Sequence, residues 1–239
     1  QCGTPQSSPR TDALIAHSSL DPIHVRRLDT LSALCCSAAL DVIPEEMNEP
    51  RGERQRTGVV MGSVLGSMEH NAAYQARLTE RGHGRADPRK FPATSPNLAP
   101  GMVSILFGLG GPCTSVGAGY AAPFEALLVA LELLQGGHAE HMLVIVADHR
   151  GAAVDRLLEC ANAPPPAHGA LAIRLSAQRQ EGTTPSLLPL RADILARLSG
   201  NSGSSWPDPS QVGPGSPATA QPGWPTLSAW LKDQGLQGS

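Results

Sequence analysis

The stretch 110–147 constrains the fold more than any other part of the chain. A Gly-Gly-Pro turn at 110–112 leads into a strand of small residues, a tight bend and a helix that ends near Gly136-Gly137. One face of this helix is apolar, and Ala and Val cover most of its other sides, so we expect it to be buried. The run His141 to Ala147 (HMLVIVA) is continuously apolar, as in a central strand covered on both faces.

Apolar spacing and glycine positions predict the other elements. They are a helix over Val25 to Ile43 with Asp29 and Thr30 near its N-cap, a β-type run from Gly58 to Gly66, a helix over Met68 to Arg81, a proline-containing loop from Phe91 to Pro100, a helix that begins within Gly101 to Gly108, and a strand over Gly169 to Leu175. Strands alternate with helices, which predicts an α/β layered domain.

The 239 residues favour one principal domain with appendages. We expect an N-terminal extension over residues 1–21, a domain over 22–199 and a tail over 200–239. The tail is rich in Gly, Ser and Pro and is predicted to be flexible. A short amphipathic helix carrying Trp230 is predicted within it, over Thr226 to Leu236.

Composition argues against several functional classes. A net charge of −3 and an aromatic content of 3% give no reason to expect nucleic acid as a partner. The five cysteines form no CxxC pair and no zinc spacing, which predicts reduced thiols and no metal site. No signal segment is visible at the start, and the longest apolar stretch, Ala121 to Leu134, is short and contains Glu125 and Glu132. We therefore expect a cytoplasmic protein without a membrane span.

A series of segments resembles the β-ketoacyl synthases of the thiolase superfamily. The segments are, in order, His24 to Asp29, Val59 to Gly66, Ser95 to Asn97, Phe107 to Pro112, the bend at Gly119-Tyr120, the helix leading to Gly136 to Glu140, and Met142 to Asp148. Together they cover roughly residues 22–175. The resemblance implies the N-terminal half of a ketosynthase, with a layered α-β-α arrangement and a mixed sheet.

One departure from the family pattern concerns the nucleophile. The resemblance places Tyr120 where active members have the cysteine that carries the acyl chain. In the family, that thiolate is stabilised at a helix N-terminus. A phenol with a pKa of about 10 is a poor replacement. Cys113, seven residues earlier, either rescues this role or packs in the interior, and packing is the favoured interpretation.

A second departure concerns acid–base groups. In the family, active ketosynthases take their decarboxylating histidines and a lysine from a C-terminal half, whereas no histidine follows His168 in this sequence. His138 and His141 are predicted to be a polar helix end and a strand start. We therefore expect no catalytic residue for condensation within the chain.

By this resemblance, the chain is similar to the short chain-length-factor partners of two-subunit ketosynthases in aryl polyene and polyketide pathways. Its partners would be a catalytic ketosynthase subunit, in a heterodimer, and an acyl carrier protein that supplies the phosphopantetheine arm, with no other cofactor. The small-residue strand would pair across the dimer through Cys113, Thr114, Ser115, Val116, Gly117 and Ala118. Tyr120, Phe124 and Phe107 would either line an acyl tunnel or pack the core.

Three alternatives remain open. The chain could be a degenerate structural or scaffold protein that only keeps the fold. It could be a stand-alone acyltransferase or hydrolase that uses Ser115 or Ser63, although no G-x-S-x-G elbow is present. It could bind a nucleotide, although the glycines from Gly58 to Gly66 do not have the dinucleotide-binding spacing.

Overall fold

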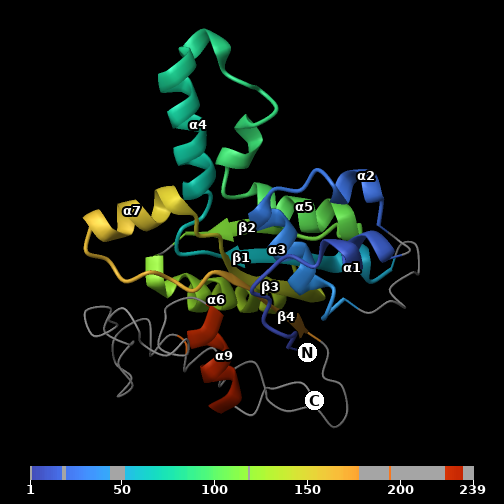
Figure 1. The fold of residues 1–239 in the computed structure, drawn as a ribbon. Coiled ribbons are helices and arrows are strands. Elements are labelled where there is room, and N and C mark those ends of the chain that lie inside the picture. The colour runs from blue at the N-terminus through green and yellow to red at the C-terminus, as the bar shows by residue number, and fades with distance from the viewer. Residues whose placement is uncertain are drawn as a thin grey trace.

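The computed structural model describes residues 2–17, 20–43, 52–117, 119–177, 194 and 224–233. Within them, a four-stranded sheet lies between two layers of helices (Figure 1). The strand order is β2 (Cys113–Val116), β1 (Thr57–Gly62), β3 (His141–Asp148) and β4 (Gly169–Ser176). β1 runs parallel to both β2 and β3, while β4 is antiparallel to β3, so the sheet is mixed as expected.

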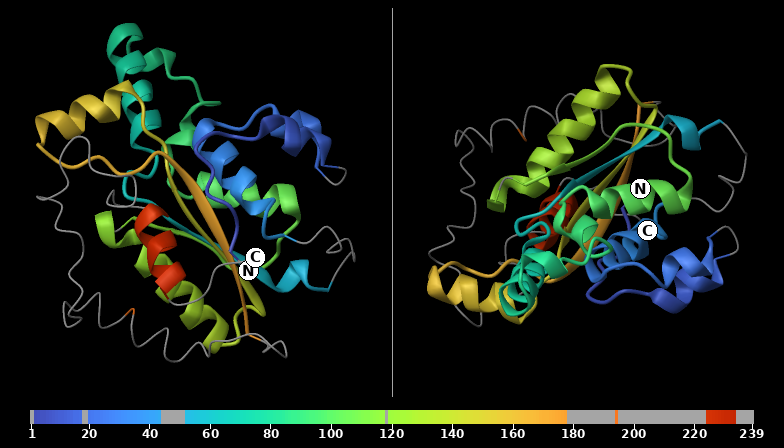
Figure 2. Two further views of the ribbon diagram at one scale, coloured as in Figure 1. Left: turned by 60° about the horizontal axis from the view of Figure 1, so that its bottom comes forward. Right: turned by 90° about the horizontal axis from the view of Figure 1, so that it is seen from above.

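Helices cover both faces of the sheet (Figure 2). One face packs against α3 (Thr30–Ala39) and α5 (Leu98–Phe107), with α1 (Thr11–Ala16) and α2 (Pro22–Val25) beyond them. The other face packs against α6 (Ala122–Gln135) and α9 (Trp224–Asp233). Every residue of β1 is buried, and so is every residue of β3 after His141, because these two strands have a helical layer on each side.

Two further helices lie at one end of the sheet. α4 (Met68–Arg81) has no buried residue and extends away from the domain (Figure 1). Two short 3-10 helices follow it, η2 (His83–Arg85) and η3 (Phe91–Thr94). α7 (Ala152–Cys160) begins where the Glu69 carboxylate of α4 accepts a hydrogen bond of 2.9 Å from the Val154 amide. The sequence analysis did not predict α7, whose only buried residue is Val154.

Most of the predicted elements are confirmed, but the continuous helix over Val25 to Ile43 is wrong. The chain forms α2 and then α3, because the Asp29 carboxylate accepts a hydrogen bond of 3.1 Å from the Ser32 amide and starts a new helix. The predicted loop over Phe91 to Pro100 is also partly wrong. It contains η3, and α5 already begins at Leu98.

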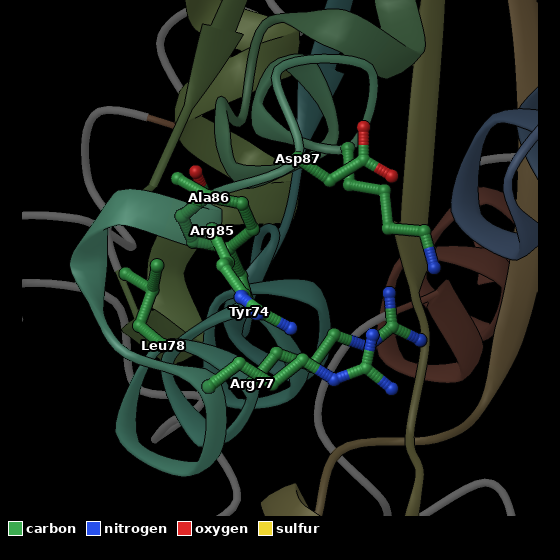
Figure 3. A pocket seen from close by; sticks show the side chains of 8 residues that line it. Tyr74, Arg77, Leu78, Arg85, Ala86 and Asp87 are labelled. Carbon is green, nitrogen blue, oxygen red and sulfur yellow. The ribbon is translucent and has the colours of Figure 1, made fainter.

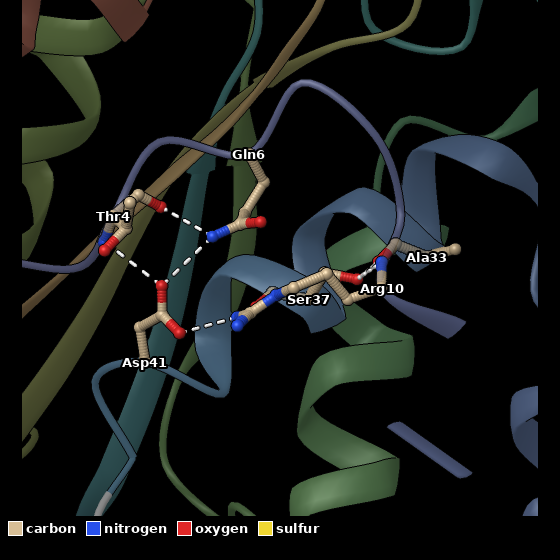
Figure 4. Close-up of polar contacts among 6 residues, drawn as sticks. All are labelled: Thr4, Gln6, Arg10, Ala33, Ser37 and Asp41. Atoms are coloured by element: carbon tan, nitrogen blue, oxygen red, sulfur yellow. Dashed lines mark hydrogen bonds and ion pairs between the residues drawn. The ribbon is translucent and has the colours of Figure 1, made fainter. Parts of the chain in front are cut away.

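The N-terminal residues contact the domain that the sequence predicts to begin at Pro22. The Gly3 amide donates a hydrogen bond to the Ala172 carbonyl oxygen of β4, Gln6 exchanges two backbone hydrogen bonds with Ala170, and Leu14 is fully buried. Asp41, just after α3, accepts hydrogen bonds of 3.1 Å from the Thr4 amide and from the Gln6 side chain (Figure 4). These contacts hold residues 2–16 against the first helical layer.

The predicted terminal helix is confirmed as α9. Its Trp230 is 4% exposed and lies edge-to-face against Phe124 of α6, with ring centroids 5.4 Å apart. The flexible linker predicted between the domain and this helix lies outside the described residues. α9 therefore completes the second helical layer from a point far along the sequence.

Phe124→Ala tests how much this packing contributes to stability. Phe124 is 1% exposed in the core between the sheet and α9, so we expect the free energy of unfolding to fall by about 3–5 kcal/mol in urea denaturation. Phe91→Ala is the matched control, because Phe91 is 62% exposed and should change stability by only about 0.5 kcal/mol. Equal effects of the two substitutions would contradict the packing described here.

Candidate functional site

The carboxyl ends of three parallel strands meet at one edge of the sheet. Gly62 of β1 pairs with Val116 of β2 and with Val146 of β3, so the loops that follow these strands are neighbours. A cavity of about 290 Å³ opens there. Its lining includes Ser63, Asn71 and Ser115. In α/β sheets, ligands bind at this edge, and it is the candidate site.

The elbow, here Gly117 and residues 119–121, lies between β2 and α6 at this edge. Ala118, which was predicted to belong to the dimer strand, lies outside the described residues. Gly119 has φ +59°, a left-handed conformation that suits glycine, and a short turn of 3-10 helix leads into α6. β1 comes very close to the start of α6, because a Cβ on Gly62 would lie 2.5 Å from the Ala122 carbonyl oxygen. The fold therefore builds a sharp strand-to-helix turn beside the cavity.

No residue from Val116 to Ala121 carries a thiol. The Tyr120 hydroxyl donates a hydrogen bond of 2.7 Å to the Pro164 carbonyl oxygen. Burial raises the pKa of Tyr120 above its ordinary value of 10.0, so the phenol stays protonated at neutral pH. The elbow thus presents a neutral phenol that is bonded to Pro164, and no thiol.

Cys113 lies at the far end of the same strand. It pairs with Val59, whereas Val116 pairs with Gly62, which puts about 10 Å of extended strand between Cys113 and the elbow. Burial raises the pKa of its thiol, which therefore remains protonated at neutral pH. This geometry favours a packing role for Cys113 over the alternative role of a substitute nucleophile.

The three aromatic residues predicted for an acyl tunnel are not brought together. Phe107 packs with the first helical layer and Phe124 with the second, on opposite faces of the sheet. Each is 1% exposed. Of the three, only Tyr120 belongs to the elbow.

A buried carboxyl group at this edge was missed by the sequence analysis. Asp148 ends β3 and accepts hydrogen bonds from the Ser63 hydroxyl (2.7 Å) and the Leu65 amide (2.8 Å). The Ser63 hydroxyl in turn accepts a hydrogen bond of 2.7 Å from the Gly66 amide. Asp148 thus fixes the loop after β1 that lines the cavity. A carboxylate directly after a buried apolar strand was the signal for it in the sequence.

Three histidines gather beside Asp148. The ring centroid of His149 lies 5.5 Å from that of His70 and 5.6 Å from that of His168. Burial is the main cause that lowers the pKa of His149 and of His168, so both are largely neutral at pH 7. Among the described residues, no group of three or more His, Cys, Asp or Glu side chains could hold a metal ion.

His138 and His141 lie away from this site. His138 is exposed after α6, and His141 begins β3 at the opposite edge of the sheet, where its Nε2 lies 3.0 Å from the Glu53 carboxylate. The prediction of a polar helix end and a strand start is confirmed for both.

A second cavity, the basic groove, lies between α4, η3 and the start of α3, with a volume of about 500 Å³. Its cationic lining comprises Arg27, Arg77, Arg89 and Lys90, and Leu28, Leu98 and Met102 supply apolar surface. The sequence analysis missed this groove, because its cations come from segments that are far apart along the chain.

Asp148→Asn should change how stability depends on pH. Burial raises the pKa of Asp148 from 3.8 to about 7, although its hydrogen bonds act in the opposite direction. The folded protein therefore holds a proton that the unfolded chain releases between pH 3.8 and about 7, so Asp148 lowers stability as the pH rises through this window. The contribution of Asp148 to the slope of the free energy of unfolding against pH is at most about 1.4 kcal/mol per pH unit. The asparagine variant should lose this contribution.

Urea denaturation at several pH values in this window measures the effect. Asp12→Asn is the control, because Asp12 is an exposed carboxyl group in α1. A slope that Asp148→Asn leaves unchanged would contradict the raised pKa.

None of the described helices is long and apolar enough to cross a membrane.

Comparison with known proteins agrees with the fold. The chain is 28% identical over 127 residues to 3-oxoacyl-[acyl-carrier-protein] synthase 2 of Staphylococcus aureus, covering 52% of this chain and 31% of that protein. The enzyme of the same name from Synechocystis is also 28% identical over 127 residues. The chain spans about a third of the length of these curated relatives.

Solved structures show the same fold. The ishigamide ketosynthase/chain length factor superposes with a TM-score of 0.56 at 25% identity, covering 70% of this chain and 48% of that one. A ketosynthase in complex with its chain length factor from Xenorhabdus doucetiae gives a TM-score of 0.53 at 21% identity, covering 66% and 62%. The architecture is therefore that of the thiolase-like ketosynthases. The family model "Beta-ketoacyl synthase, N-terminal domain" matches residues 12–153, more than half of the chain, and the chain belongs to this family.

Proposed function

We propose that the chain is a non-catalytic, chain-length-factor-type partner of a catalytic β-ketoacyl synthase. Together the pair would elongate acyl chains on an acyl carrier protein by decarboxylative condensation, in polyene, polyketide or fatty-acid-type biosynthesis. The observation that carries the proposal is the elbow, which keeps its turn beside the cavity but has no thiol from Val116 to Ala121. Without a thiolate, the acyl chain has no group on which to form a thioester.

The shape of the elbow supports a retained role in a complex. A chain that kept only its fold would need the buried helix α6, but it would not need an open cavity at the strand ends. Here a cavity of about 290 Å³ remains, lined by Ser63, Ser115 and Val116. In the proposed complex, the Tyr120 side chain would limit the space for a growing chain by its bulk.

The edge strand β2 supports pairing with another subunit. β2 ends the sheet order, and among the described residues no strand pairs with its outer edge. All four of its residues are only partly buried. An exposed strand edge is a template for further pairing. We propose the segment Cys113 to Val116 as the surface that meets the catalytic subunit.

The basic groove supports binding of the carrier protein. The phosphopantetheine arm of a carrier contains an anionic phosphodiester, which Arg and Lys side chains bind through charge-assisted hydrogen bonds. Arg27 and Arg89 both line the groove, and Leu28 and Met102 add apolar surface to its lining.

An elongation assay tests the proposed role of the chain. Carrier protein loaded with acyl and malonyl groups would be incubated with this chain, with a catalytic ketosynthase, or with both. We expect product only from the mixture, because the chain lacks the nucleophile, and a shared peak in gel filtration. Product from this chain alone would contradict the proposal. Absence of any effect of the chain on the ketosynthase would favour the scaffold alternative.

Charge reversal in the groove tests carrier binding separately. The double variant Arg27→Glu/Arg89→Glu should weaken binding of the carrier about tenfold or more, because it replaces attraction by repulsion. Isothermal titration calorimetry would measure the change. Arg26→Glu/Arg156→Glu is the matched control, since it makes the same change in charge at two exposed arginines outside the groove. Equal weakening by the control would contradict a specific site.

A further inference from the structure

The arginine pocket is a cavity at the outer end of α4 that adjoins the basic groove and has a volume of about 180 Å³ (Figure 3). It is lined by Tyr74, Arg77, Leu78, Arg81, Arg85, Ala86, Asp87 and Lys90. Neither the elbow nor the cavity beside it contributes any of these residues. The pocket shares Tyr74, Arg77 and Lys90 with the basic groove, whereas Arg81 and Arg85 line the pocket alone.

The backbone builds this pocket by folding back on α4. Tyr74, Arg77 and Arg81 are spaced so that they lie on one face of the helix. Gly82 then ends the helix with φ +80°, a conformation that favours glycine, and its amide donates to the Leu78 carbonyl oxygen. The turn η2 and the residues up to Lys90 return along this face, which encloses the pocket between two segments of the chain.

The lining carries a large excess of positive charge. Three arginines and one lysine face a single carboxylate, so the net charge of the lining is +3. That carboxylate, Asp87, accepts hydrogen bonds from the amide (3.0 Å) and the Nε (3.3 Å) of Arg89, which lies outside the pocket. In the part of the chain that the structure describes, Arg77, Arg81 and Arg85 form no ion pair.

Such a cluster is unfavourable without a counter-ion. Arg77 and Arg81 stand four residues apart on one helix, where like charges repel each other and destabilise the helix. An anion between them would relieve this repulsion. The guanidinium group presents donors in a planar fork that matches the oxygens of a phosphate, which makes arginine clusters suited to phosphoryl groups.

We infer that the arginine pocket binds a phosphoryl group. Its volume is below the roughly 300–1,000 Å³ of ordinary small-molecule sites, so it suits a phosphate or diphosphate group better than a large ligand. The group could belong to a free phosphorylated metabolite or to a phosphopantetheine arm. Tyr74 adds a hydroxyl donor and an aromatic face to the lining. The inference does not depend on a catalytic partner, because this chain supplies every residue of the pocket.

Titration calorimetry with inorganic pyrophosphate tests the pocket on the full chain, with sodium chloride added to hold the ionic strength constant. We expect saturable binding of one pyrophosphate. The double variant Arg81→Ala/Arg85→Ala should weaken it about tenfold or more, because charged donors of the site are lost. Arg26→Ala/Arg156→Ala is the matched control, because it removes the same charge from exposed positions outside both the pocket and the basic groove. Thermal melting of each variant would show that it is folded.

Competition then identifies the source of the group. If free phosphopantetheine displaces pyrophosphate more effectively than a simple diphosphate ester does, the group belongs to a phosphopantetheine arm. If the diphosphate ester is the more effective competitor, the group belongs to a free metabolite. Absence of saturable binding at millimolar pyrophosphate would overturn the inference. So would equal weakening by the two double variants. These results concern the pocket alone, because the elongation assay measures a different property of the chain.

Discussion

The pairing of β1 with β3, buried between two helical layers, is the constraint on which the rest of the structure depends. Each strand hydrogen-bonds to neighbours on both sides, so the backbone polar groups of the centre of the sheet are paired without water. Because β1, β2 and β3 are parallel, their carboxyl ends must meet at one edge. That edge holds the cavity, the elbow and Asp148. The position of the candidate site thus follows from strand direction.

The chemistry at this edge depends on very few side chains. The turn between β2 and α6 requires the left-handed Gly119 and the close approach at Gly62, and both are present. The geometry of this turn therefore depends on its glycines and does not require a thiol. Asp148 adds a different constraint. It joins the end of β3 to the loop after β1 through Ser63 and Leu65, which holds one wall of the cavity in place.

Charge is distributed unevenly over the molecule. The chain carries a net charge of −3, yet cations concentrate around the arm formed by α4 and the segment that follows it. α4 has no buried residue, so core packing does not restrict which side chains its surface carries. Its surface can therefore carry the cations that line the arginine pocket and the basic groove. The elbow, by contrast, lies against the core and is restricted by it.

The sequence by itself determined the local elements. The helix Met68–Arg81 and the strand from His141 were predictable, because periodicity and apolar runs are properties of neighbouring residues. The break between α2 and α3 was not predicted, because the apolar pattern continues across it. The Asp29 carboxylate caps α3 and starts a new helix there. Tertiary structure alone decided that Ser63 meets Asp148, that Phe107 and Phe124 lie on opposite faces, and that Arg27 shares the basic groove with Arg77 and Arg89. These contacts join residues distant in the chain, and only the packing of the sheet and helices brings them together.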